Sequence, residues 1–197
     1  MIDLGPAARE VRRLLTGVTQ EHLTAPTPCA GTPVAGLLDH LMGLTLAFTW
    51  AATKTGPPGG GQPSASPEAL DPYWRVVLPR RLEALAEAWR APSAWEGLTE
   101  AGGVTMPGEV MGVVALDELV LHGWDLARAT GQPYEVDPVS AEAVLEFVAE
   151  SARPEQAHLR EGLFGPVVPV PPDAPVFDRA LGLAGRDPAW APSPART

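Results

Sequence analysis

Cysteine is almost absent from this chain of 197 residues, which holds only Cys29. A single cysteine cannot form a disulfide within the chain, so the sequence predicts a free thiol in a reducing compartment. Lysine and isoleucine also occur only once each, beside abundant alanine, arginine and proline. This bias is typical of a GC-rich genome and indicates little about chemistry.

Excess basic charge and long apolar runs are lacking too. The formal net charge is −10 and the pI is about 4.8, which disfavours binding to nucleic acid or to an anionic membrane surface. No run of about 18 apolar residues predicts a membrane span. The N-terminal stretch shows no basic segment followed by an apolar one, as a signal peptide would. We therefore expect a cytoplasmic protein.

Helical periodicity accounts for most of the chain. Apolar residues three and four apart, with capping residues and prolines at the starts, predict helices over residues 3–22, 33–54, 66–90, 108–130, 137–152 and 173–185. Residues 93–107 are expected to be irregular, and no segment shows a convincing strand alternation. The Gly/Pro/Ser-rich run at 55–66 predicts a long crossover.

These elements predict an all-α fold. Residues 1–153 are expected to form a four-helix bundle with a following helix. Residues 154–197 are expected to form a short proline-rich C-terminal extension with one helix, packed on the bundle. The sequence leaves the oligomeric state open, with a homodimer as one option.

Three polar residues share one stripe of the helix predicted over 108–130. Glu118, His122 and Asp125 lie at positions i, i+4 and i+7, which face the same way on a helix. Leu119 and Leu126 flank this stripe, so the polar groups are expected to face the core. Buried carboxylates and imidazoles need a bound cation or a satisfied hydrogen-bond network. Glutamate four residues before histidine favours the cation, because both side chains can reach one ion.

A third metal ligand must come from elsewhere, and His40 is the best candidate. It lies on the helix predicted over 33–54, three residues after Leu37 and four before Leu44, and so is expected to face inward. His40, Glu118 and His122 would leave room in a metal shell for water or substrate. Asp125 could orient a ligand from outside that shell. Zinc is the first choice of metal, with nickel, iron or manganese as alternatives.

Other readings of these residues remain open. An internal hydrogen-bond network without metal would also explain the stripe. Cys29 lies in the loop before the second helix, where a small buried residue and a pocket-lining residue are equally consistent with the pattern. His22 and His158 are expected at the surface, and Trp124 is expected to pack in the core.

Several motifs together resemble one family. They are Thr27-Pro28-Cys29, the L-L-D-H-L at 37–41, the E-L-V-L-H-G-W-D-L-A-R-A-T-G at 118–131, and the late F-G-P-V-V-P-V-P and G-R-D-P. In this order they are similar to actinobacterial metal-binding proteins related to the N-terminal domain of mycothiol-dependent maleylpyruvate isomerase, within the DinB-like superfamily. The resemblance implies a DinB-like four-helix bundle, a divalent metal at His40, Glu118 and His122, and mycothiol as cosubstrate.

Two functions follow as hypotheses. The first is an enzyme in which the metal lowers the pKa of a bound thiol, which then attacks a small electrophile as a transferase or isomerase-like catalyst. Isomerisation of maleylpyruvate itself is not expected, because the second domain of the full isomerases is not recognised here. The second is a non-catalytic module that binds metal or senses metal or thiol. A closed four-ligand shell completed by Asp125 would favour the module, and an open pocket the enzyme.

Overall fold

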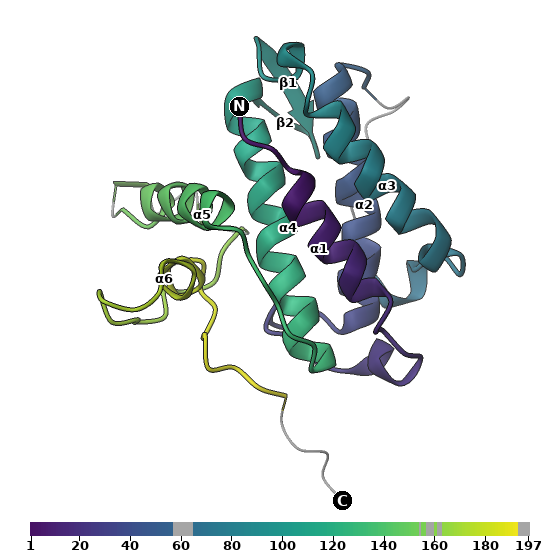
Figure 1. Ribbon diagram of the computed structural model, residues 1–197, viewed down its shortest axis with the longest axis vertical. Helices are drawn as coiled ribbons and strands as arrows, with labels where there is room; N and C mark the ends of the chain where they lie inside the picture. Colours follow the sequence, from purple (N-terminus) through teal and green to yellow (C-terminus); the bar gives the residue numbers. More distant parts are fainter. Residues whose placement is uncertain (57–64, 154, 157–159, 161–162, 193–197) are drawn as a thin grey trace, which may run out of the picture.

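The computed structural model describes residues 1–56, 65–153, 155–156, 160 and 163–192. This part of the chain is mostly helical, with one small hairpin (Figure 1). Its α-helices are α1 (Gly5–Leu15), α2 (Val34–Thr53), α3 (Trp74–Ala88), α4 (Gly108–Thr130), α5 (Pro138–Ser151) and α6 (Val176–Leu183). Short 3-10 turns lie at η1 (Glu21–Thr24), η2 (Pro67–Ala69) and η3 (Pro92–Ala94). Most of the predicted crossover, residues 57–64, lies outside the described residues.

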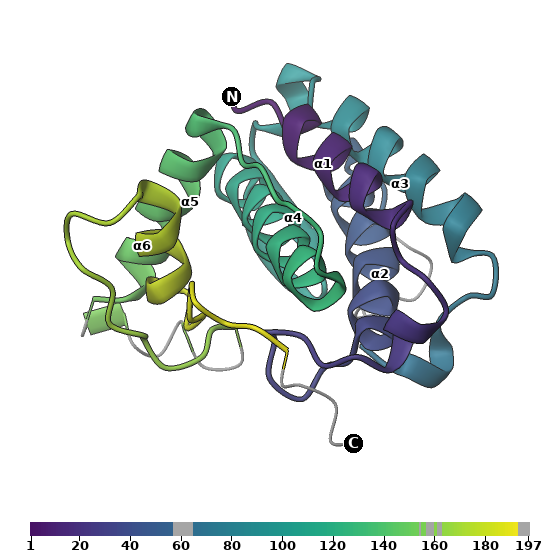
Figure 2. The same ribbon diagram turned by 60° about the horizontal axis from the view of Figure 1, so that its bottom comes forward.

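Helices α1 to α4 lie side by side and share one core (Figures 1 and 2). α2 packs against α3 and α4, and α1 packs against the same two helices. Leucines at helical spacing on α2 and α4 are buried in this core, among them Leu37, Leu41, Leu116 and Leu119. Each contributes about 2 kcal/mol by leaving water. The helical class is confirmed, whereas the exact four-helix-bundle geometry stays a prediction.

Residues 93–107 contain a β-hairpin, so the expectation of irregular structure is wrong. Strands β1 (Leu98–Ala101) and β2 (Val104–Pro107) pair antiparallel. The turn between them is Gly102-Gly103, with φ of 57° and 81°. Glycine adopts these left-handed angles without a steric penalty, and a Gly-Gly pair is a hairpin signal. The signal was easy to miss because each strand has only four residues and most of them are not buried.

Two helices are shorter than predicted. The first ends at Leu15 instead of residue 22, and Gly17 follows, a residue that disfavours helix. The third begins at Trp74 instead of residue 66, because Pro72 disfavours helical geometry in the residue before it. The other four predicted helices agree with the observed ones to within three residues at each end.

The C-terminal part lies on one side of α4. α5 packs against α4, and α6 packs against α5 (Figures 1 and 2). After α6 the chain turns at Gly185, which has φ of 81°. The next residue, Arg186, binds a side chain of α4. The described part of the extension therefore touches the helix that carries the predicted site. The domain division at residue 153 stays a prediction.

Helix α2 is long and apolar enough to cross a membrane by length and composition. However, 67% of its apolar window is buried inside the chain, and its neighbours are α3 and α4. Core helices commonly meet the same length criterion. The predicted absence of a membrane partner stays a prediction.

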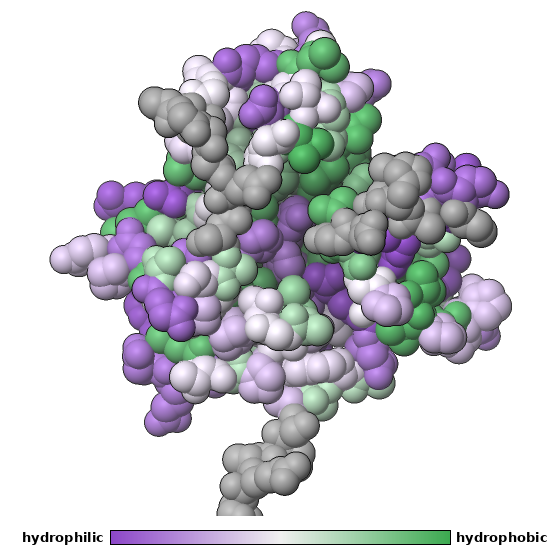
Figure 3. All heavy atoms as spheres, turned by 180° about the vertical axis from the view of Figure 1, so that it is seen from behind, coloured by the Kyte–Doolittle hydropathy of each residue, from purple (hydrophilic) through white to green (hydrophobic). Residues whose placement is uncertain are grey.

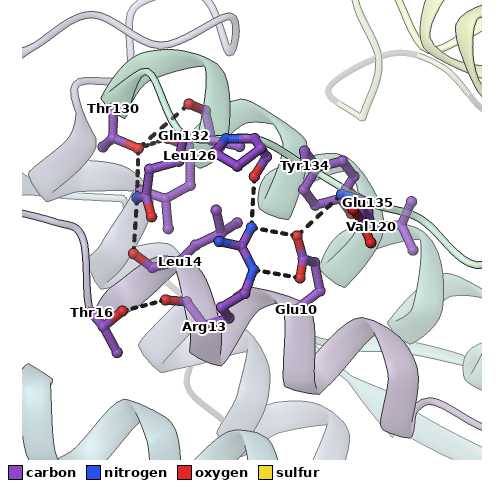
Figure 4. A network of polar contacts seen from close by, with 12 residues as sticks. Glu10, Arg13, Leu14, Thr16, Val120, Leu126, Thr130, Gln132, Tyr134 and Glu135 are labelled. Carbon is purple, nitrogen blue, oxygen red and sulfur yellow. Dashed lines mark hydrogen bonds and ion pairs between the residues drawn. The ribbon is translucent and has the colours of Figure 1, made fainter.

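A polar network joins α1 to the segment that follows α4 (Figure 4). Arg13 donates two hydrogen bonds to the carboxylate of Glu10, at 2.8 and 2.6 Å, and one to the carbonyl oxygen of Pro133 at 2.6 Å. The same carboxylate accepts a hydrogen bond from the backbone N–H of Glu135 at 3.1 Å. The network fixes the path of the chain between α4 and α5.

This network predicts an acid-sensitive contribution to stability. The Arg13 guanidinium lowers the pKa of the Glu10 carboxyl, so the stabilisation is present above the unfolded pKa and is lost as pH falls through the folded one. We expect Glu10→Gln to lower the free energy of unfolding by about 1 kcal/mol at neutral pH, with the difference shrinking toward zero at an acidic pH below the lowered pKa of folded Glu10. Urea denaturation at both pH values measures this. Glu87→Gln, which removes an exposed ion pair with Arg90, should change little at either pH, and a loss for Glu10→Gln that is independent of pH would contradict the assignment.

Candidate metal centre

Two helices supply the polar cluster. α4 presents Glu118, His122 and Asp125 on one face, because its helical period brings these positions into line. α2 presents His40 from beside the buried Leu37. His122 and Asp125 are buried, whereas the side chains of His40 and Glu118 keep 26% and 23% of their surface exposed. The structure thus brings the three predicted ligands together at the edge of the core.

The atoms of the cluster lie close enough to share one ion. Nε2 of His122 lies 2.9 Å from Oε2 of Glu118, and Nε2 of His40 lies 3.6 Å from the same oxygen. The two imidazole rings are perpendicular, with centroids 5.0 Å apart. One ligand atom from each of the three residues lies within 4.8 Å of the others. Such spacing is compatible with metal–ligand bonds of about 2 Å to a central ion.

Asp125 holds the other side of His122. Its Oδ2 lies 2.9 Å from Nδ1 of His122, opposite the nitrogen that faces Glu118. Arg186 donates to both oxygens of Asp125, from Nε at 3.0 Å and from Nη2 at 2.8 Å. A carboxylate on Nδ1 fixes the ring and leaves the Nε2 lone pair for a metal. Arg186 and Asp125 therefore form a buried ion pair behind His122.

Charge in the cluster is strongly coupled. Burial alone would lower the pKa of His122, but hydrogen bonds with Asp125 and Glu118 outweigh it and raise the pKa to about 10. Burial alone would raise the pKa of Glu118, but hydrogen bonds from His122 and His40 hold this pKa well below its usual range. The Arg186 charge overcomes burial in the same way and lowers the pKa of Asp125. The arrangement favours positive charge between the carboxylates of Glu118 and Asp125, where His122 lies.

A cavity of about 500 Å³ opens beside the cluster. Its walls come from α2, α4, the loop before α2 and two segments of the C-terminal extension. Figure 3 shows a hollow near the centre of the face opposite to that of Figure 1, where hydrophilic residues gather. Small-molecule sites commonly have volumes of about 300–1,000 Å³, so a thiol or a small organic substrate would fit.

Two C-terminal motifs meet in the wall of this cavity. Gly165, of the F-G-P motif, lies against Gly185, of the G-R-D-P motif, and a Cβ on Gly185 would lie 2.7 Å from the Gly165 backbone. The positive φ of Gly185 also requires glycine. This close approach positions Arg186 so that its guanidinium can hydrogen-bond the carboxylate of Asp125. Both motifs can be recognised in the sequence, but the sequence predicted no role for Arg186.

Asp117 is a second residue that sequence reasoning missed. It lines the cavity, its relative exposure is 4%, and its Oδ1 has no hydrogen-bond partner among the residues that the structure describes. Burial, and then the neighbouring Glu118 charge, raise the pKa of Asp117 well above its usual value. The available signal was helical spacing, since Asp117 lies four and seven residues before the buried Leu121 and Trp124.

Cys29 belongs to a second group of neighbouring donors. Its Sγ lies within 4.8 Å of a ring nitrogen of His122 and of a carboxylate oxygen of Asp125. Arg186 already binds both oxygens of that carboxylate, and its positive charge would repel a cation there. The group of His40, Glu118 and His122 is therefore the better metal candidate. Of the two readings of Cys29, the structure favours the pocket-lining one.

The remaining predicted positions lie apart from the cavity. His22 is in η1, half-buried, and its Nδ1 accepts a hydrogen bond from the backbone N–H of Thr19. Trp124 is buried in the core, as predicted. His158 lies outside the described residues.

Comparison with known proteins decides the family. The family model of the mycothiol maleylpyruvate isomerase N-terminal domain matches residues 4–127. The chain belongs to this family. The match includes His40, Asp117, Glu118, His122 and Asp125 and ends before the segment with Arg186. It confirms the predicted family, and the DinB-like superfamily is consistent with it.

The chain is also similar to two curated relatives and to one solved structure. An uncharacterized protein of Mycobacterium tuberculosis, from strains CDC 1551 / Oshkosh and ATCC 25618 / H37Rv, is 28% identical over 181 residues, covering 88% of this chain and 90% of the relative. The crystal structure of the mycothiol-dependent maleylpyruvate isomerase matches with a TM-score of 0.57 and 18% identity. It covers 74% of this chain and 66% of that chain. At this identity the likeness shows the helical fold.

Proposed function

We propose that this family member holds a divalent metal through His40, Glu118 and His122 and uses it in a mycothiol-dependent, isomerase-like or thiol-transfer reaction on a small electrophile. The observation that carries the proposal is the convergence of three donor atoms from two helices, within 4.8 Å of one another, at the wall of a cavity of about 500 Å³. The name of the family supplies mycothiol as the thiol.

The residues present fit a catalytic metal. Two imidazoles and one carboxylate form a donor set typical of catalytic zinc sites, and nickel, iron or manganese accept the same donors. The strong preference of the cluster for positive charge, seen in the pKa shifts of Glu118 and His122, suits a cation as well as a proton. A divalent metal held there would lower the pKa of a thiol or water that binds to it.

The protein groups around the cluster have separate roles. Asp125, itself held by Arg186, keeps the Nδ1 proton of His122 in place and so presents Nε2 toward the cavity. The apolar side chains of Leu121 and Phe164 line the cavity and limit water near the reacting groups. The C-terminal extension thus stabilises the metal ligand His122 indirectly, because its Arg186 holds Asp125 and Asp125 holds His122.

The position of Asp125 favours an enzyme over a closed structural metal site. A structural site would need a fourth protein ligand. Asp125 contacts the nitrogen of His122 that faces away from Glu118, and Arg186 binds both of its oxygens, so it is not placed to complete the shell. The partial exposure of His40 and Glu118 leaves the cluster open to a ligand from the cavity.

An activity assay tests the proposal. Metal-loaded protein is expected to accelerate the reaction of mycothiol with the electrophile monochlorobimane, and His40→Ala should lower that rate at least about a hundredfold. His22→Ala, a histidine outside the cavity, is the matched control and should keep the wild-type rate. Equal rates for wild type and His40→Ala, or no dependence on the thiol, would show that the proposed function is wrong.

A further inference from the structure

Part of the wall of the cavity beside the candidate metal centre is apolar. Its side chains come from three separate segments of the chain. The segment before α6 contributes Leu163, Phe164 and Pro166, α4 contributes Leu121, and the loop before α2 contributes Pro28. Ligand sites in proteins commonly combine such apolar walls with a few polar groups that orient the ligand. This part of the wall is therefore a candidate for the surface that selects the substrate.

The ring of Phe164 is held in place before any ligand arrives. It lies edge-to-face with the ring of Phe147 of α5, with centroids 6.3 Å apart, an arrangement that aromatic pairs favour. The guanidinium carbon of Arg160 lies 5.4 Å from the centroid of the Phe164 ring, within the range of a cation–π contact. The backbone N–H of Phe164 also donates a hydrogen bond to the carbonyl oxygen of Arg160 at 3.0 Å. Phe164 thus offers the cavity a fixed apolar surface, so little conformational entropy is lost when a ligand packs on it.

Leu163 is a large apolar residue that remains 66% exposed at this wall. A single exposed leucine is common on protein surfaces and alone indicates nothing. However, Leu163 directly precedes Phe164 and lines the same cavity, so an apolar ligand that packs on Phe164 would cover it as well. Removal of these two side chains from water would favour binding of the ligand.

The charged groups of the wall disfavour an anionic substrate. Apart from the three metal candidates, they are Asp117 and Arg186 among the described residues. Arg186 binds both oxygens of Asp125 and donates a further hydrogen bond from Nη1 to the carbonyl oxygen of Ala184 at 3.2 Å. Its charge is thus already balanced by Asp125. An anionic substrate would lose water without gaining an uncommitted arginine or lysine from the described part of this wall, and this loss is costly.

We propose that the electrophilic substrate carries an uncharged apolar group, of the class of an aromatic ring, which packs on Phe164 and Leu163. These two residues then determine specificity, because they favour an uncharged aryl compound over its carboxylated analogue. The three metal candidates would face the reactive end of the same molecule. The inference rests on the proposed function for the reaction, whereas binding of the apolar group needs neither metal nor thiol.

Binding to the full chain, freed of metal, tests the apolar surface by itself. The probes are benzamide and benzoate, which have the same ring and nearly the same shape but differ in charge. We expect saturation-transfer NMR titrations to show that benzamide binds at least about tenfold more tightly than benzoate. The difference should persist at about 0.5 M salt, where the overall charge of the chain is screened. Equal affinities, or no binding of benzamide, would overturn the proposal.

Two matched variants locate the bound ring. Leu163→Asp should weaken benzamide binding at least about fivefold, because it replaces an apolar contact with a charge. Val139→Asp places the same charge on a valine of α5 that is 67% exposed and lies outside the cavity wall, so it should bind benzamide as the wild type does. Both positions are exposed, so neither change removes a core residue. Equal affinities of the two variants for benzamide would place the ring elsewhere and contradict the proposal.

The reaction tests whether this surface selects the substrate. In metal-loaded protein the sulfur of mycothiol attacks the benzylic carbon of benzyl chloride, so a C–S bond forms, the C–Cl bond breaks, chloride leaves and the thiol proton passes to solvent. After correction for the uncatalysed rates, kcat/KM should be at least about tenfold higher for benzyl chloride than for 4-(chloromethyl)benzoate. Catalysis of both with equal kcat/KM would overturn this inference alone. Catalysis of neither, beside selective benzamide binding, would overturn the proposed function but not the apolar ligand site.

Discussion

Wild-type protein purified without an affinity-metal column is expected to carry about one divalent metal per chain, and His122→Ala less than about a tenth of that. The reason is geometric. His122 is the buried member of the three donors, and its Nε2 lies 2.9 Å from the Glu118 carboxylate. Its loss leaves one imidazole and one carboxylate, too few for a stable site. Elemental mass spectrometry measures the metal directly.

His22→Ala is the matched control for this experiment and should retain the metal. Equal metal in wild type and His122→Ala would place the ion elsewhere. Absence of metal from both, even after incubation with zinc or nickel, would leave Glu118, His122 and Asp125 as an internal hydrogen-bond network. That was the alternative left open by the sequence.

Arg186→Met is expected to be the most destabilising single change near the site. Asp125 is fully buried and accepts two hydrogen bonds from Arg186. The substitution therefore leaves a buried carboxylate whose remaining side-chain partner, within the described part of the chain, is His122. Breaking such a pair costs about 3–5 kcal/mol of unfolding free energy. Metal affinity should also fall by about 10–100-fold, because Asp125 orients His122. Urea denaturation and metal titration measure the two effects.

A double variant separates these effects. Asp125→Asn combined with Arg186→Met removes the unpaired charge and should recover part of the stability lost by Arg186→Met alone. Metal affinity should stay low, since no carboxylate then holds His122. Arg153→Met, which breaks an exposed pair with Glu150, should change both quantities little. A loss below about 0.5 kcal/mol for Arg186→Met would contradict the role assigned to this ion pair.

The sequence predicted what depends on local periodicity. Glu118, His122 and Asp125 share a face because one helix carries them, and the structure places them as that spacing requires. His40 was found because the apolar residues around it revealed the inward face of α2. That these residues bind metal stays a prediction.

The sequence did not reveal what depends on distant parts of the chain. Arg186 lies 61 residues after Asp125, and a turn at Gly185 brings the two together. No local sequence pattern predicts an ion pair between residues so far apart in the chain. The same holds for Cys29, which lies near His122 because a loop packs there, and for Asp117 Oδ1, which has no hydrogen-bond partner in the described residues.

Absorption spectroscopy of the cobalt-substituted protein tests the central claim most directly, because it reports on metal and thiol together. Cobalt(II) bound by His40, Glu118 and His122 should give visible bands that are absent in His122→Ala. Addition of mycothiol should add a sulfur-to-cobalt charge-transfer band in the near ultraviolet, also in Cys29→Ser, which excludes the protein's own thiol. Cobalt bands that mycothiol leaves unchanged would contradict the account, because the metal would then be inaccessible to the thiol that it is proposed to activate.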